Sequence, residues 1–185
     1  MIALLGDAIE ADGLLPGACY VRSPNQDARP SGEAIRLIVV HAISLPPGEF
    51  GGDGIERLFT NRLDAVAHPY YRAIQTLRVS AHFLIRRDGE VLQFVPCDRR
   101  AWHAGASCWR GREGCNDYSI GIELEGCGEL PFSDFQYARL GQLVRVLGRT
   151  YGIEDIAGHA DIAPGRKTDP GPNFDWRRLH ASLVD

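Results

Sequence analysis

Two histidines follow short apolar runs that are typical of strands. His41 ends the run IRLIVVH, and His159 ends the run DIAGH. Because open α/β sheets place ligands at the carboxyl ends of their strands, we expect the two imidazoles to converge. A catalytic zinc ion takes three protein ligands from His, Asp, Glu or Cys and leaves one position for water. The histidines supply two ligands, and the third is a carboxylate from Asp161 or Asp169, between which the spacing does not decide.

A glutamate and a lysine complete this set of reactive groups. Glu123 lies inside the apolar run SIGIELEG. Burial raises the pKa of a carboxyl group, which suits a general base near neutral pH, although an ion pair with an arginine is the structural alternative. Lys167 is the only lysine among 20 basic residues. Its compact ammonium can turn its donors toward one developing oxyanion, with chance placement in an arginine-rich chain as the alternative.

Short β-branched runs predict the strands that would carry these groups. Strands are expected at residues 35–42 and 119–126, and a short strand or turn at 155–159. Residues 35–42 show no polar alternation, which is typical of a strand buried on both faces. Residues 80–96 predict a hairpin, because two β-prone runs flank Asp88-Gly89, a pair suited to a tight primed turn.

One long helix is marked at both ends. Ser133 and Gln136 form a capping-box pattern that opens it. Apolar residues recur at helical spacing from Leu140 to Leu147, and Gly152 is expected to end the helix. Such a helix has one apolar face to pack against a sheet.

The alternation of strands and helices predicts an α/β fold, with a central mixed β-sheet flanked by helices. Shorter helices are expected at 55–59 and 173–184. Residues 99–117 are interpreted as a long loop, which in a compact domain is usually functional. The segment 44–80 begins with glycines and prolines and is a candidate lid.

The length of 185 residues predicts one domain spanning 1–185, with an irregular lead-in at 1–34 and a catalytic core at 35–180. A net charge of −4 argues against nucleic acid as a partner. The chain has no apolar run near the ~20 residues of a membrane span and no secretory signal. Its five cysteines form no C-x-x-C pair. We therefore expect reduced thiols, a cytoplasmic location and a monomer.

Five segments in this order resemble the AmpD family: VVHAISLPPGEFGG, VSAHFLIRRDG, AWHAG, SIGIELEG and GHADIAPGRKTDPGP. The resemblance covers roughly residues 20–180. Members of this family are cytoplasmic zinc amidases that act on anhydro-muropeptides, within the superfamily of N-acetylmuramoyl-L-alanine amidases and peptidoglycan recognition proteins. The resemblance implies the fold of that superfamily. It also implies hydrolysis of the bond between the lactyl group of (anhydro-)N-acetylmuramic acid and L-alanine, in the recycling of cell-wall fragments.

The resemblance also implies roles for single residues. One zinc ion per chain would be held by His41, His159 and Asp169. Glu123 would act as the general base and acid, and Lys167 would stabilise the oxyanion. Three further residues are expected to contact substrate: Arg78, Trp102 and Arg166. For Trp102 the alternative is a loop anchor packed in the core.

Of the other histidines, His82 is expected to be structural and His103 to line the cleft without binding metal. The family commonly has asparagine where this chain has Ala42, and arginine where it has Gly114, so substrate preference is open. Many superfamily members also have a tyrosine at the position of Ala81. Because alanine has no hydroxyl, the acid/base role would fall on Glu123.

Two alternative functions differ from a cytoplasmic amidase. A muropeptide-binding module without catalysis would lack a metal ligand or the acid/base residue, and none is missing here. An amidase acting on intact peptidoglycan would be exported, which the absent signal and the unpaired cysteines argue against.

Overall fold

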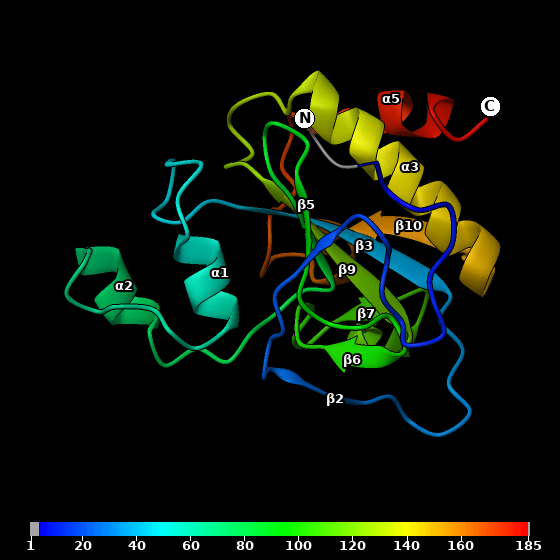
Figure 1. The fold of residues 1–185 in the computed structure, drawn as a ribbon, viewed down its shortest axis with the longest axis horizontal. Coiled ribbons are helices and arrows are strands. Elements are labelled where there is room, and N and C mark those ends of the chain that lie inside the picture. The colour runs from blue at the N-terminus through cyan, green and yellow to red at the C-terminus, as the bar shows by residue number, and fades with distance from the viewer. Residues whose placement is uncertain (1–3, 185) are drawn as a thin grey trace.

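The computed structural model describes residues 4–184 and is built around a six-stranded sheet (Figure 1). In their order across the sheet the strands are β1 (Cys19–Tyr20), β5 (Val91–Gln93), β4 (Phe83–Ile85), β9 (Ser119–Glu125), β3 (Leu37–Ile43) and β10 (Asp155–Gly158). The β4–β5 pair is antiparallel, whereas the other neighbours in this sheet are parallel. The predicted α/β fold with a mixed sheet is confirmed.

Helices lie on both sides of this sheet. They are α1 (Gly54–Phe59), α2 (Pro69–Ile74), α3 (Asp134–Tyr151), α4 (His159–Ile162) and α5 (Trp176–Ala181). Figure 1 shows α3 and α5 together on one side and α1 and α2 on the other. The apolar faces of α3 and α5 pack on β3 and β9 in one core cluster, while α1 packs on β4 and β5 in a second.

The long helix α3 forms where the sequence predicts it. The Ser133 hydroxyl accepts from the Gln136 N–H, and the Gln136 side chain accepts from the Ser133 N–H, which completes the capping box. Leu140 and Leu147 are fully buried against the sheet. Gly152 ends the helix with a φ of 66°, a left-handed conformation that glycine adopts without strain.

Replacing Ser133 by alanine is expected to lower the free energy of unfolding by about 1 kcal/mol, because the first turn of α3 loses its cap. Urea unfolding followed by circular dichroism measures the difference. Ser133→Thr keeps a hydroxyl acceptor and serves as the control. Equal stability of the alanine variant and the wild type would show that the cap contributes nothing here.

Both faces of β3 are buried, as its sequence predicts. Ile38 and Val40 pack toward α3, whereas Leu37 and Val39 pack into a third cluster with residues of the 104–118 segment and α4. Successive side chains of a strand point to opposite faces. His41 therefore lies on the face of β3 opposite to α3.

The hairpin between β4 and β5 is confirmed, but the predicted primed turn is wrong. The Gly89 N–H donates to the Arg86 carbonyl, and Arg86 pairs with Glu90 across the end of the hairpin. Gly89 has a φ of 89°, whereas Asp88 has no positive φ. The chain turns through three residues, with the left-handed conformation only at the last of them.

The segment 99–117 contains more regular structure than the expected loop. It holds β6 (Arg99–Ala101), β7 (Cys108–Trp109), β8 (Arg112–Glu113) and the 3-10 helix η1 (Cys115–Asp117). β7 pairs with β8, and β6 pairs with β2 (Gln26–Ala28) from the lead-in. These strands are too short to show a periodic pattern, so the sequence does not reveal them.

Two features of the structure bear on the expectations about membranes and cysteines. Among residues 4–184, none of the helices has the length and apolarity needed to cross a membrane. All five cysteines are free thiols, two of them buried.

Candidate active site

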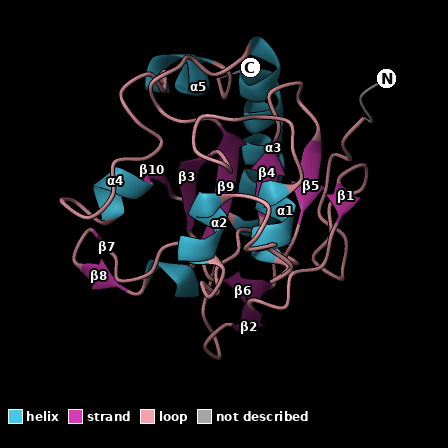
Figure 2. Ribbon diagram, turned by 90° about the vertical axis from the view of Figure 1, so that its left-hand side faces the viewer, coloured by secondary structure: helices cyan, strands magenta, loops and turns pink. Residues whose placement is uncertain are grey.

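The two histidines lie on neighbouring strands of the sheet. β10 runs parallel to β3 with Gly158 opposite Val40, so the next residues along each strand, His159 and His41, lie side by side. Figure 2 shows α4 following β10 directly beside β3. His41 lies two residues before the end of β3, and His159 is the first residue of α4 rather than the last of a strand.

Three side-chain atoms meet at this point. The Nδ1 atoms of His41 and His159 are 2.9 Å apart, and Asp169 Oδ2 lies 3.2 Å from the first and 3.1 Å from the second. Ligands of a tetrahedral zinc ion with bonds near 2.1 Å would be roughly 3.4 Å apart. Both histidines are buried and the aspartate is partly exposed. The donor set, two imidazole nitrogens and one carboxylate oxygen, therefore fits a catalytic metal ion.

The protonation states of His41 and Asp169 suit metal binding. Burial lowers the pKa of His41 to about 4, so its imidazole is neutral at pH 7. Burial by itself raises the pKa of Asp169, but hydrogen bonds with His159 and His41 outweigh it and hold this pKa below 3.8. Neutral imidazoles and an ionised carboxylate are the forms that bind a metal ion.

The other candidate aspartate is used elsewhere. Asp161 Oδ2 accepts from the Gly158 N–H at 2.7 Å, at the start of α4, and the side chain is exposed. Of the two carboxylates that the spacing left open, the fold brings Asp169 to the histidines.

Glu123 lies beside the same point. It is directly opposite His41 in the parallel pair of β9 and β3. The residue is only 8% exposed, and its Oε2 has no hydrogen-bond partner within residues 4–184. Burial, and then the charge of Asp169, raise the pKa of Glu123 well above 4.5, while the charge of Lys167 acts in the opposite direction. The alternative of an arginine ion pair applies instead to Glu125, which pairs with Arg86.

Glu123→Gln is expected to stabilise the metal-free protein at pH 8 by about 1–3 kcal/mol, because a buried carboxylate without a partner is costly. The raised folded-state pKa means that the folded wild type binds more protons than the unfolded chain above pH 4.5. Its stability therefore falls as the pH rises through this window, up to the raised pKa. Urea unfolding with a chelator at pH 8 and pH 4 measures the effect. A glutamine variant no more stable than wild type at pH 8 would contradict it.

These groups line one cleft of about 990 Å³. Lys167, Trp102 and Arg166 line it together with the histidines, and segment 44–80 contributes a wall. Two Arg166 hydrogen bonds go to the carbonyls of Ala104 and Ala106. Arg78 is exposed and lies between two lining residues, Leu77 and Val79, with its guanidinium donating to nearby carbonyls.

Two buried histidines differ in their contacts. His82 Nδ1 accepts from the Gly121 N–H, and its Nε2–H donates to the Arg99 carbonyl, which is a structural use. His103 lines the cleft, and its Nδ1 lies 3.0 Å from His41 Nε2. This contact to a candidate ligand was not foreseen from the sequence.

The chain matches a known family over most of its length. The sequence pattern of the family described as N-acetylmuramoyl-L-alanine amidase matches residues 31–172. The chain belongs to the N-acetylmuramoyl-L-alanine amidase family. A curated relative of the amidase, 1,6-anhydro-N-acetylmuramyl-L-alanine amidase AmpD from Enterobacter cloacae, is 58% identical over 175 residues, which is 94% of each chain.

Solved structures agree with the fold of the amidase. A crystal structure of a selenomethionine derivative of AmpD superposes with a TM-score of 0.90 at 55% identity, covering 93% of this chain and 97% of that chain. The Escherichia coli amidase AmiD, solved with the substrate anhydro-N-acetylmuramic acid-L-Ala-D-gamma-Glu-L-Lys, has a TM-score of 0.59 at 31% identity. It covers 94% of this chain and 65% of that chain.

The three positions at which this sequence departs from the family pattern lie in different parts of the amidase. Ala42 lines the cleft. Gly114 precedes η1 with a φ of 71°, a conformation in which an arginine would be strained. Ala81 is fully buried in the core cluster that includes α1 and carries no hydroxyl.

Proposed function

We propose that this amidase holds one zinc ion between His41, His159 and Asp169 and hydrolyses the amide bond between the lactyl group of anhydro-N-acetylmuramic acid and L-alanine. The observation that carries the proposal is the meeting of three ligand atoms within 3.2 Å beside a buried carboxyl group, in one cleft. The products are an anhydro-sugar and a free stem peptide. The names of the relatives support this substrate class.

Each residue near the metal site has a part in the proposed reaction. A zinc ion bound there supplies a Lewis acid that activates water and polarises the amide carbonyl. Glu123 takes a proton from the attacking water and returns it to the departing L-alanine nitrogen. The raised pKa of Glu123 suits both transfers, because a carboxyl group titrating nearer neutral pH can accept and donate. His41 and His159 hold the metal and take no proton.

Lys167 is assigned to the negative charge that develops on the carbonyl oxygen. Its side chain is exposed to the cleft, and its charge acts on both Glu123 and His41. A lysine ammonium directs its donors toward one oxygen, whereas an arginine presents a planar fork.

Lys167→Met is expected to lower kcat by about 10²–10³-fold with a smaller change in KM, because the donor acts mainly in the transition state. Steady-state kinetics on an anhydro-muropeptide measure both constants. Lys167→Arg keeps the charge and should recover part of the loss. A methionine variant that changes KM alone would remove Lys167 from this role.

Substrate contacts extend the proposal along the cleft. Trp102 packs against the sugar ring, and Arg166 and Arg78 meet carboxylates of the lactyl-peptide. The lining positions of Trp102 and Arg166 and the neighbouring position of Arg78 support these roles. The wall formed by segment 44–80 is the proposed lid.

The proposed setting is the recycling of wall fragments in the cytoplasm by a monomeric, single-domain enzyme. The five free cysteines support a reducing compartment. Neither nucleic acid nor membrane is a proposed partner, in keeping with the net charge of −4.

One experiment separates this function from its alternatives. The zinc-loaded protein is incubated with an anhydro-muropeptide and, separately, with intact peptidoglycan, and released peptide is identified by mass spectrometry. We expect release from the anhydro-muropeptide. Release from intact wall alone would support a wall-degrading amidase, and binding without release would support a non-catalytic module.

A further inference from the structure

Each candidate imidazole ligand has a second ring nitrogen that faces away from the metal site. His41 Nε2 lies 3.0 Å from His103 Nδ1. His159 Nε2 lies 3.3 Å from the carbonyl oxygen of Ala104. Two consecutive residues therefore contact the outer nitrogens of both ligands. This inference rests on the proposed function, because it takes the two histidines as metal ligands.

The direction of the hydrogen bonds follows from the donors available. An Nδ1 that binds a metal ion presents a lone pair, so the proton of a neutral His41 is on Nε2 and is donated to His103 Nδ1. The proton of His103 must then be on its Nε2, which lies 3.2 Å from the Ser119 hydroxyl oxygen. That hydroxyl donates in turn to the Cys115 carbonyl. The chain of donors runs one way and ends on a backbone acceptor.

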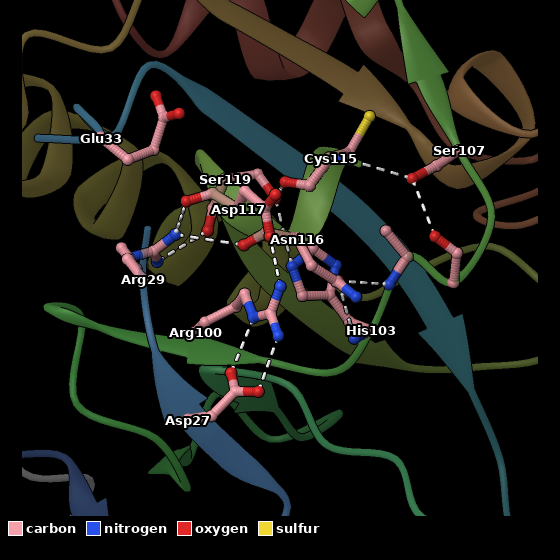
Figure 3. Close-up of polar contacts among 12 residues, drawn as sticks. Asp27, Arg29, Glu33, Arg100, His103, Ser107, Cys115, Asn116, Asp117 and Ser119 are labelled. Carbon is pink, nitrogen blue, oxygen red and sulfur yellow. Dashed lines mark hydrogen bonds and ion pairs between the residues drawn. The ribbon is translucent and has the colours of Figure 1, made fainter. Parts of the chain in front are cut away.

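The backbone N–H groups of the segment that makes these contacts are held by the side chain of Asn116. Asn116 Oδ1 accepts from the His103 N–H at 3.1 Å and from the Ala104 N–H at 2.8 Å. Figure 3 shows Asn116 beside His103 and next to Arg29. The Arg29 guanidinium donates to the Asn116 and Ser119 carbonyls and so ties η1 to β9. The backbone N–H groups of both residues are therefore held by a single amide oxygen, while the Ala104 carbonyl also accepts from Arg166.

The ring of His103 has little freedom to move. It lies against Gly121 of β9, where a Cβ atom would come within 2.5 Å of its Cγ. His103 is also buried. A residue without a side chain at position 121 is what allows the ring to reach both His41 and Ser119.

We propose that the segment His103–Ala104, clamped by Asn116, is the element that fixes the tautomer and orientation of both imidazole ligands. His103 and Asn116 are positioning residues, because they act on the metal site through His41 and His159. Partners of this kind typically contribute 10–100-fold to metal affinity.

Zinc affinity, measured by competition with a chromophoric chelator in the absence of substrate, tests the role of His103. His103→Ala should weaken zinc binding about 10–100-fold, and His103→Asn should recover most of this loss, since its amide oxygen can accept from His41 Nε2–H. His82→Asn is the matched control, because His82 is also a buried histidine but makes no hydrogen bond to His41 or His159. This replacement should leave zinc affinity unchanged. Wild-type affinity in His103→Ala, or an asparagine variant as weak as the alanine variant, would overturn the proposal.

A second pair of variants tests the clamp. Asn116→Ala removes the acceptor of both N–H groups and should weaken zinc binding, whereas Asn116→Asp keeps an acceptor and should bind more tightly than the alanine variant. Nitrogen-15 spectra of the imidazoles supply a readout besides affinity. They should place the ring protons of His41, His103 and His159 on Nε2 in the zinc-loaded protein. A proton on Nδ1 of His103 would overturn the proposed chain.

These outcomes are distinct from failure of the proposed function. A wild-type protein that binds zinc but releases no peptide from an anhydro-muropeptide would refute the hydrolase and leave the clamp standing. A wild-type protein that binds no zinc would refute both.

Discussion

Glu123→Gln is expected to lower kcat by about 10²–10⁴-fold while zinc content stays at the wild-type level. The amide cannot take a proton from water or return one to the leaving nitrogen, and general acid–base catalysis typically contributes this much. Glu123 is opposite His41 across the β3–β9 pair but is not among the three grouped ligand atoms, so the metal site should survive. Kinetics on an anhydro-muropeptide and metal analysis of the same sample measure both effects.

The control for this variant is Glu113→Gln, since Glu113 is an exposed glutamate of β8. It should keep full activity. Retention of wild-type turnover by Glu123→Gln would remove Glu123 from the proposed mechanism. Loss of zinc from Glu123→Gln would instead make it part of the metal site.

Asp169→Ala is expected to reduce zinc from one ion per chain to near none and to remove the hydrolytic activity. Two imidazoles remain, but a catalytic zinc site uses three protein ligands. Asp169 Oδ2 lies within 3.2 Å of the Nδ1 atoms of both histidines, so the substitution removes one of the three ligand atoms that meet there. Metal analysis after removal of free zinc measures the effect.

Asp161→Ala is the matched control for this prediction. Asp161 has the same chemistry and lies two residues after His159, yet its carboxylate accepts from the Gly158 N–H. The variant should keep its zinc, with some loss of stability at the start of α4. Zinc retained by Asp169→Ala and lost from Asp161→Ala would reverse the assignment.

The regular parts of the fold could be predicted from local signals. The capping box at Ser133 and the glycine at 152 mark the ends of α3, because each satisfies backbone groups within a few residues. The apolar run of β3 predicts a strand buried on both faces, because successive side chains of a strand point to opposite faces. By contrast, the turn at Asp88-Gly89 depends on how β4 and β5 register, which the dipeptide alone does not determine.

The site depends on contacts between distant segments, which the sequence shows less directly. The expectation that His41 and His159 converge follows from the general geometry of parallel sheets. The spacing left Asp161 and Asp169 open, because the choice depends on which carboxylate is used as a cap at Gly158. The contact between His103 and Asn116 joins residues that are 13 positions apart in the chain. The contact between His103 and His41 joins residues that are 62 positions apart. No periodicity in the chain records such pairs.

The location of a metal ion in the folded protein tests the central proposal most directly. Anomalous scattering from crystals of the zinc-loaded protein, collected on either side of the zinc edge, shows where zinc binds. We expect one peak about 2.0–2.2 Å from His41 Nδ1, His159 Nδ1 and Asp169 Oδ2. A peak bound by other side chains, or no peak beside these three atoms, would contradict it.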